Sequence, residues 1–97
     1  MIFLITSVDN ISQVAIYDNI DQITNGIDWQ DMFEGKSIVL DEVGNLYAWD
    51  ASRITEYATV QGYTLKVIDT DYELLKQCQE AYETMGKPNE FEINRQK

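Results

Sequence analysis

The hydrophobic residues of this chain come in short runs, and glycines stand between them. The run Ile2–Ile5 is continuous, but it is far shorter than the roughly 20 residues that a membrane-spanning helix needs. Glycine adopts positive φ at no steric cost, so it is typical of turns and of helix ends. The five glycines all stand at the ends of predicted elements: Gly26, Gly35, Gly44, Gly62 and Gly86. The chain is therefore expected to form many short helices and strands, without a glycine-rich phosphate loop.

Several segments have the composition of β-strands. Ile2–Ile5 is typical of a buried strand. Residues 12–17 also fit a helical face, but their Val, Ile and Tyr residues favour a strand. Ser37–Asp41 and Leu46–Trp49 flank Gly44-Asn45, which predicts a hairpin with a tight turn. Two more strands are predicted, at Tyr63–Asp69 and, on the edge of the sheet, around Phe91 and Ile93.

Helices are predicted where capping residues precede apolar residues at helical spacing. Two short ones run from Asp18 to Gly26 and from Asp28 to Gly35, and a third begins at Asp50 or Ser52 and ends at Gln61. The longest helix is predicted at about Asp71–Met85. There, Thr70-Asp71-Tyr72-Glu73 matches a capping box in which the Thr70 hydroxyl and the Glu73 carboxylate each accept a backbone N–H.

Together these elements predict one α+β domain over residues 1–97, with residues 94–97 frayed. Its sheet is expected to be largely antiparallel, with the helices packed on one face. The predicted core is Phe3, Ile5, Ile38, Leu40, Leu46, Ile54, Leu65, Val67, Leu75, Cys78 and Tyr82.

The residues needed for the common catalytic sites are missing. The chain has no histidine and one cysteine, which excludes histidine-dependent triads, imidazole zinc sites and an internal disulfide. Cys78 falls on the apolar face of the long helix, where a packed core thiol is expected. Asp69 and Asp71 fit helix capping better than a magnesium site or an acid–base pair. We therefore expect no enzyme activity, no catalytic residues, no cofactor and no bound metal.

The start of the chain does not have the pattern of a secretory signal. No Lys or Arg precedes Ile2–Ile5, and no cleavage site of small residues follows it. A single unpaired thiol agrees with a reducing compartment. The sequence thus predicts a cytoplasmic protein.

Negative charge is the most unusual feature of the composition. The chain has 17 acidic and 7 basic residues, a net charge of −10, so direct binding to nucleic acid is not expected. In the first 50 residues Lys36 is the only base. If two short helices carry Asp18, Asp21, Asp28, Asp31 and Glu34, their carboxylates form a ridge along one surface. The predicted partner-binding residues are Asp18, Asp21, Asp28, Trp29, Asp31, Glu34, Asp41, Glu42 and Asp50.

Such a ridge has two interpretations. The acids serve only for solubility, or they take the place of DNA phosphates in a groove lined by Lys and Arg on a partner protein. Aromatic and amide side chains interleaved with the acids would add contacts: Tyr17, Asn19, Asn25, Trp29 and Gln30.

In its size, its acidity and its lack of catalytic residues, the chain resembles small phage-encoded inhibitors of host defence, including anti-CRISPR proteins and other DNA mimics. The resemblance covers the composition of the whole chain and depends on no motif. It implies a stoichiometric inhibitor of a nucleic-acid-binding complex. An immunity protein or antitoxin that blocks a nuclease toxin fits the same charge, and so does an interaction domain whose acids have no electrostatic role. A fourth hypothesis is an enzyme that uses paired carboxylates.

Overall fold

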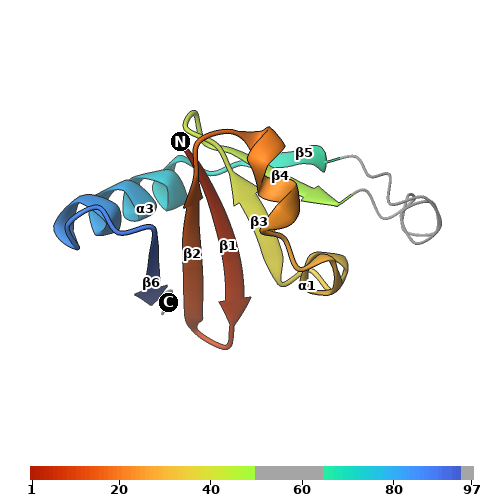
Figure 1. The fold of residues 1–97 in the computed structure, drawn as a ribbon, viewed down its shortest axis with the longest axis horizontal. Helices are drawn as coiled ribbons and strands as arrows, with labels where there is room; N and C mark the ends of the chain where they lie inside the picture. Colours follow the sequence, from red (N-terminus) through yellow and green to blue (C-terminus); the bar gives the residue numbers. More distant parts are fainter. Residues whose placement is uncertain (50–64, 95–97) are drawn as a thin grey trace.

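The computed structural model describes residues 1–49 and 65–94, in which six strands form one antiparallel sheet (Figure 1). The strand order is β5-β4-β3-β1-β2-β6. The strands are β1 (Ile2–Val8), β2 (Ile11–Tyr17), β3 (Ser37–Leu40), β4 (Asn45–Trp49), β5 (Leu65–Thr70) and β6 (Glu90–Asn94). The helices are the 3-10 helix η1 (Ile20–Asn25), α1 (Trp29–Phe33) and α3 (Tyr72–Thr84). The predicted α+β fold with an antiparallel sheet is confirmed.

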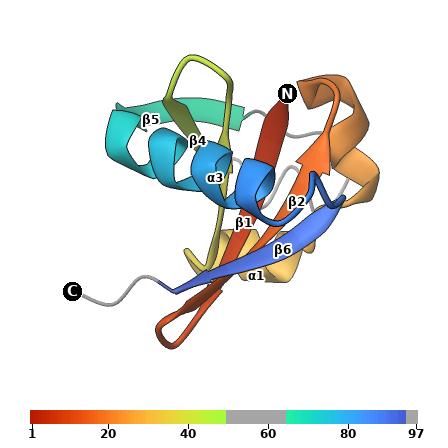
Figure 2. The ribbon, with the colours of Figure 1, turned by 90° about the vertical axis from the view of Figure 1, so that its left-hand side faces the viewer.

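Hydrophobic residues are buried on both faces of the sheet. On β1, Phe3 and Ile5 join the cluster under α3, whereas Ile2 and Leu4 join the cluster under η1 and α1. Figures 1 and 2 show α3 on one side of the strands and α1 on the other. Successive side chains of a strand point to opposite faces, so a central strand covered on both faces must be apolar throughout. This explains the uninterrupted Ile2–Ile5 run, and it differs from the expectation of helices on one face.

The predicted strands and hairpin are confirmed where they fall on described residues; the start of the strand predicted at Tyr63–Asp69 lies outside them, and β5 covers its remainder. The ambiguous segment is β2, which pairs with β1 along its whole length, from Ile2 with Tyr17 to Val8 with Ile11. The β3–β4 hairpin turns at Gly44, whose φ of +92° lies in the region that favours glycine. Among the described strands β6 pairs with β2 alone and is an edge strand, as expected.

Two of the three described helices begin at a different capping residue from the one predicted. Asp28 caps α1 as expected, but Asn19 rather than Asp18 caps η1. Asp71 rather than Thr70 caps α3, and its carboxylate accepts the Leu74 N–H at 2.9 Å. The Asp71 N–H in turn donates to the Gly44 carbonyl at 2.9 Å. This contact between the β3–β4 turn and the start of α3 holds Asp71 at the cap position, which the capping-box pattern does not reveal.

Most of the predicted core is confirmed. Phe3, Ile5, Leu40, Leu46, Leu75 and Cys78 are buried, and Ile38, Tyr82 and Leu65 pack against the clusters. The prediction that Val67 is buried is wrong, because this residue lies on β5, at one edge of the described sheet, and is 49% exposed. Alternation along a strand shows which residues share a face, but not whether another element covers that face. Ile54 and the helix predicted to end at Gln61 lie outside the described residues.

Candidate functional site

Five of the acids among the predicted binding residues lie on the segment that joins β2 to β3: Asp18, Asp21, Asp28, Asp31 and Glu34. We call residues 18–36 the acidic connection. Four of these side chains are exposed, and that of Asp31 is partly buried. The inner side of the connection is apolar, with Ile23 and Met32 buried against the sheet. The carboxylates therefore lie on the outer side.

The acidic connection runs along the length of the sheet. Asp18 follows the end of β2, where Tyr17 pairs with Ile2. Lys36 is at the opposite end of β1, where its carbonyl accepts the Ser7 N–H at 2.8 Å. Six residues of strand separate these positions, a distance of about 20 Å. The five acids thus form an extended row rather than a compact cluster, and Figure 1 shows η1 and α1 following each other along it.

Asp28, Asp31 and Glu34 lie near Lys36, the basic residue of the acidic connection. The Lys36 ammonium lies 2.7 Å from a Glu34 carboxylate oxygen. The hydrogen bond to Glu34, followed by the charges of Glu34, Asp31 and Asp28, raises the pKa of Lys36. Hydrogen bonds from Lys36 and then Gln30, together with the Lys36 charge, lower the pKa of Glu34. The α1 end of the row is therefore partly neutralised, because the Glu34 carboxylate is already engaged by Lys36 and Gln30.

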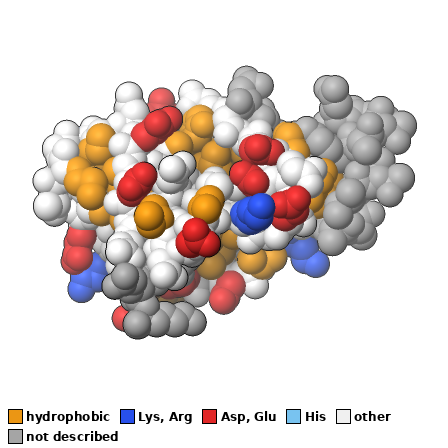
Figure 3. Space-filling view, turned by 90° about the horizontal axis from the view of Figure 1, so that it is seen from below, with side chains coloured by type: hydrophobic (Ala, Val, Ile, Leu, Met, Phe, Trp, Pro, Cys, Tyr) orange, Lys and Arg blue, Asp and Glu red, His pale blue; other side chains and the backbone are white. Residues whose placement is uncertain are grey.

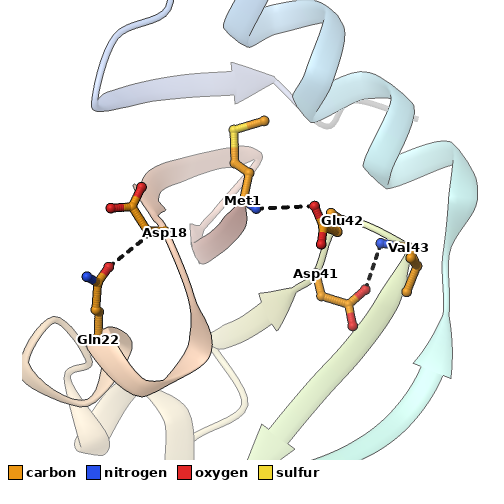
Figure 4. Close-up of polar contacts among 6 residues, drawn as sticks. All are labelled: Met1, Asp18, Gln22, Asp41, Glu42 and Val43. Atoms are coloured by element: carbon orange, nitrogen blue, oxygen red, sulfur yellow. Dashed lines mark hydrogen bonds and ion pairs between the residues drawn. The ribbon is translucent and has the colours of Figure 1, made fainter.

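Asp41 is a structural residue of the β3–β4 turn rather than a surface acid. Its carboxylate accepts the Val43 N–H at 3.0 Å (Figure 4). It also accepts the Asn45 N–H at 2.9 Å, the Asn45 side-chain amide at 3.2 Å and the Tyr47 hydroxyl at 3.1 Å. Burial by itself raises the pKa of Asp41, but the hydrogen bonds from Asn45, Val43 and Tyr47 outweigh it and lower the pKa. Asp41 is 9% exposed, so we exclude it from the candidate surface.

Glu42 and Asp18 lie at the same end of the sheet, on either side of Met1 (Figure 4). The Glu42 carboxylate is 3.5 Å from the N-terminal ammonium. The Asp18 backbone N–H donates to the Gln22 side-chain oxygen at 3.1 Å. The Asp18 side chain itself is exposed. Glu42 can therefore extend the row beyond Asp18. Asp50 and the Asn25 side chain lie outside the part of the structure that is described.

Trp29 belongs to an aromatic group beneath the acidic connection. Its ring centroid lies 5.2 Å from that of Trp49 and 6.2 Å from that of Phe33. The rings of Phe33 and Trp49 are 5.1 Å apart. Trp29 is partly buried, so it anchors α1 to the sheet and presents only part of its surface to a partner.

The charge on the surface is dispersed. Figure 3 shows acidic side chains over much of one face, with hydrophobic side chains between them and a basic side chain among several acids. Within residues 1–49 and 65–94, no group of three or more His, Cys, Asp or Glu side chains is arranged to hold a metal ion. Over the same residues, no helix has the length and apolar character needed to cross a membrane.

Comparisons with protein-family models, with curated proteins and with solved structures found no match for this chain. Its function is therefore inferred from its own residues.

Proposed function

We propose that this protein is a non-enzymatic, cytoplasmic inhibitor that binds a basic, nucleic-acid-binding surface of a partner protein. The acidic connection supplies the contact, with Glu42 at one end. The observation that supports the proposal is the row of five carboxylates, spread over about 20 Å and accompanied by one base, Lys36. No cofactor and no catalytic residue enter this function.

The physical basis is charge replacement. Each strand of B-DNA carries one phosphate charge per roughly 3.4 Å of helix axis, and basic grooves bind these charges with Lys and Arg. A row of carboxylates offers the same groove hydrogen-bond acceptors that carry the same negative charge. The negative field steers association, so binding should be fast and should weaken steeply as salt rises. A partner held in this way is inhibited because nucleic acid and the acidic connection compete for one groove.

The test removes charge while keeping the fold. In the triple variant Asp21→Asn, Asp28→Asn and Asp31→Asn, the cap of α1 is preserved, because asparagine caps a helix about as well as aspartate. The control variant Glu73→Gln, Glu80→Gln and Glu83→Gln changes the net charge equally on α3, where these side chains are exposed. Circular dichroism establishes that both variants fold.

Binding is measured by immobilising each variant and passing a bacterial lysate over it, with elution by salt and by a short DNA duplex. We expect wild type and the α3 control to retain proteins that elute between about 50 and 200 mM salt and that duplex DNA displaces. The triple variant should retain at least tenfold less. Equal retention by the triple variant, or retention that neither salt nor DNA changes, would contradict the proposal. A retained nuclease toxin, still lost with the triple variant, would select the immunity-protein form of the function.

A further inference from the structure

A groove of about 420 Å³ lies over β1, β2 and β6, beside the segment covered by η1. It is lined by Leu4, Thr6, Gln13, Val14, Ala15, Tyr17, Gly26, Glu90, Phe91 and Glu92. Leu4 pairs with Ala15, and Ala15 pairs with Glu90 on its other side. These three side chains therefore share one face of the sheet. The groove lies where this face continues beyond the cover provided by η1 and α1.

The two ends of the groove differ in chemistry. Tyr17 closes one end, with its hydroxyl against Gly26 so closely that a Cβ atom at Gly26 would overlap it. Glu90 and Glu92 stand along β6, opposite Ala15 and Gln13. Leu4 and Ala15 give the floor an apolar centre. A ligand with a hydrocarbon stem and a cationic head matches this lining.

The groove carries negative charge from Glu90 and Glu92. None of its lining residues is basic, and within the described part of the chain neither Glu90 nor Glu92 forms an ion pair. Alternate residues of a strand point to the same side and lie about 7 Å apart. An extended peptide has the same repeat, so basic side chains at alternating positions match the two carboxylates in register.

We propose that this groove binds an extended basic segment of a partner protein that carries arginine at alternating positions. The guanidinium groups contact Glu90 and Glu92, and one arginine stem lies over Leu4 and Ala15 toward the Tyr17 ring. Arginine suits this arrangement because it pairs with carboxylates in two parallel hydrogen bonds and stacks on aromatic rings. The groove meets the acidic connection at Gly26, but its two glutamates lie on β6, and the proposal does not depend on the function proposed for the acidic connection.

The test uses a defined probe, the peptide Arg-Thr-Arg-Thr-Arg with blocked ends, titrated into the full chain by calorimetry at low salt. The variant Glu90→Gln with Glu92→Gln should bind it about tenfold more weakly. The control Glu80→Gln with Glu83→Gln removes the same charge from α3 and should bind like wild type. A peptide of the same composition with its three arginines adjacent should bind several-fold more weakly than the alternating one.

Amide NMR shifts locate the contact independently of affinity. The alternating peptide should shift the signals of Gln13, Ala15 and the β6 residues in the wild-type chain. Shifts confined to the acidic connection, equal weakening by the α3 control, or equal binding of spermidine and of the peptide would each overturn the proposal. Loss of peptide binding in the Glu90→Gln, Glu92→Gln variant, with retention of lysate proteins, would separate this groove from the function proposed above.

Discussion

Replacement of Asp41 by alanine tests whether this acid serves the fold or a partner. The change removes a carboxylate that accepts four hydrogen bonds. The donors are the Val43 N–H, the N–H and the side-chain amide of Asn45, and the Tyr47 hydroxyl. The backbone N–H groups of Val43 and Asn45 then lose their acceptor in a part-buried site. A matched control is Glu42→Ala, because that neighbouring side chain is exposed and contacts the N-terminal ammonium at 3.5 Å.

The magnitude follows from the hydrogen bonds. A hydrogen bond to a charged group contributes roughly 1.5–3 kcal/mol, but bonds that share one group do not add. We therefore expect Asp41→Ala to lower the free energy of unfolding by about 3 kcal/mol, and Glu42→Ala by less than about 0.5 kcal/mol. Asp41→Asn keeps one acceptor oxygen but places an NH₂ group against the donor of the Asn45 side chain. It should cost about 1–2 kcal/mol. For a domain of this size, 3 kcal/mol is a large part of the total stability of roughly 5–15 kcal/mol.

The assay is urea unfolding of the three variants and wild type, followed by circular dichroism at several pH values. The pKa of Asp41 is lower in the folded chain, so its stabilisation is present above the unfolded pKa of about 3.9. That stabilisation is lost as the pH falls toward the folded pKa. The difference between wild type and Asp41→Asn should stay constant from about pH 7 to pH 5 and shrink below about pH 4. Asp41→Ala and Glu42→Ala with equal unfolding free energies would refute the structural role of Asp41.

Two further predictions concern the same end of the sheet and the start of α3. Gly44→Ala should lower the free energy of unfolding by about 2–3 kcal/mol, because a Cβ there meets the Tyr72 ring at 2.8 Å in addition to a φ of +92°. Gly35→Ala, with a φ of +75° and open space around it, should cost about 1 kcal/mol, so chemical denaturation that gave equal losses would exclude the Tyr72 contact. Asp71→Ala should cost about 1 kcal/mol by removing the α3 cap, whereas Thr70→Ala should be nearly neutral. If thermal unfolding showed a larger loss for Thr70→Ala than for Asp71→Ala, Thr70 rather than Asp71 would be the capping residue of α3.

Local sequence patterns predicted most of the elements correctly. The apolar run at the start of the chain, the turn at Gly44-Asn45 and the spacing of Trp29, Met32 and Phe33 each specify structure over a few residues. These signals are strong because turn geometry and helix periodicity depend on neighbours in the sequence. The burial of Val67 was predicted wrongly because burial depends on which element covers a strand.

For the acids too, the sequence shows their number but not their arrangement in space. Their number and their excess before residue 50 are visible in the sequence. Their spacing along the chain does not show that Asp18 and Glu34 lie at opposite ends of β1, nor that the Asp41 carboxylate turns inward to hold a hairpin. The groove beside Glu90 and Glu92 was missed because its walls come from β1, β2 and β6, and β6 is about 75 residues away from β2 in the sequence. Alternation in β6 was the one signal that put both glutamates on a single face.

The sequence by itself determined the fold class, the approximate positions of most of the short elements and the absence of histidine, because composition, turn residues and hydrophobic periodicity act locally. Tertiary structure decided which acids are exposed, which face of each strand is covered and where the groove lies. It also decided that Asp71 caps α3, through the hydrogen bond between its N–H and the Gly44 carbonyl. Each of these depends on residues far apart in the chain, and their contacts form only when strand pairing and the packing of the helices bring them together.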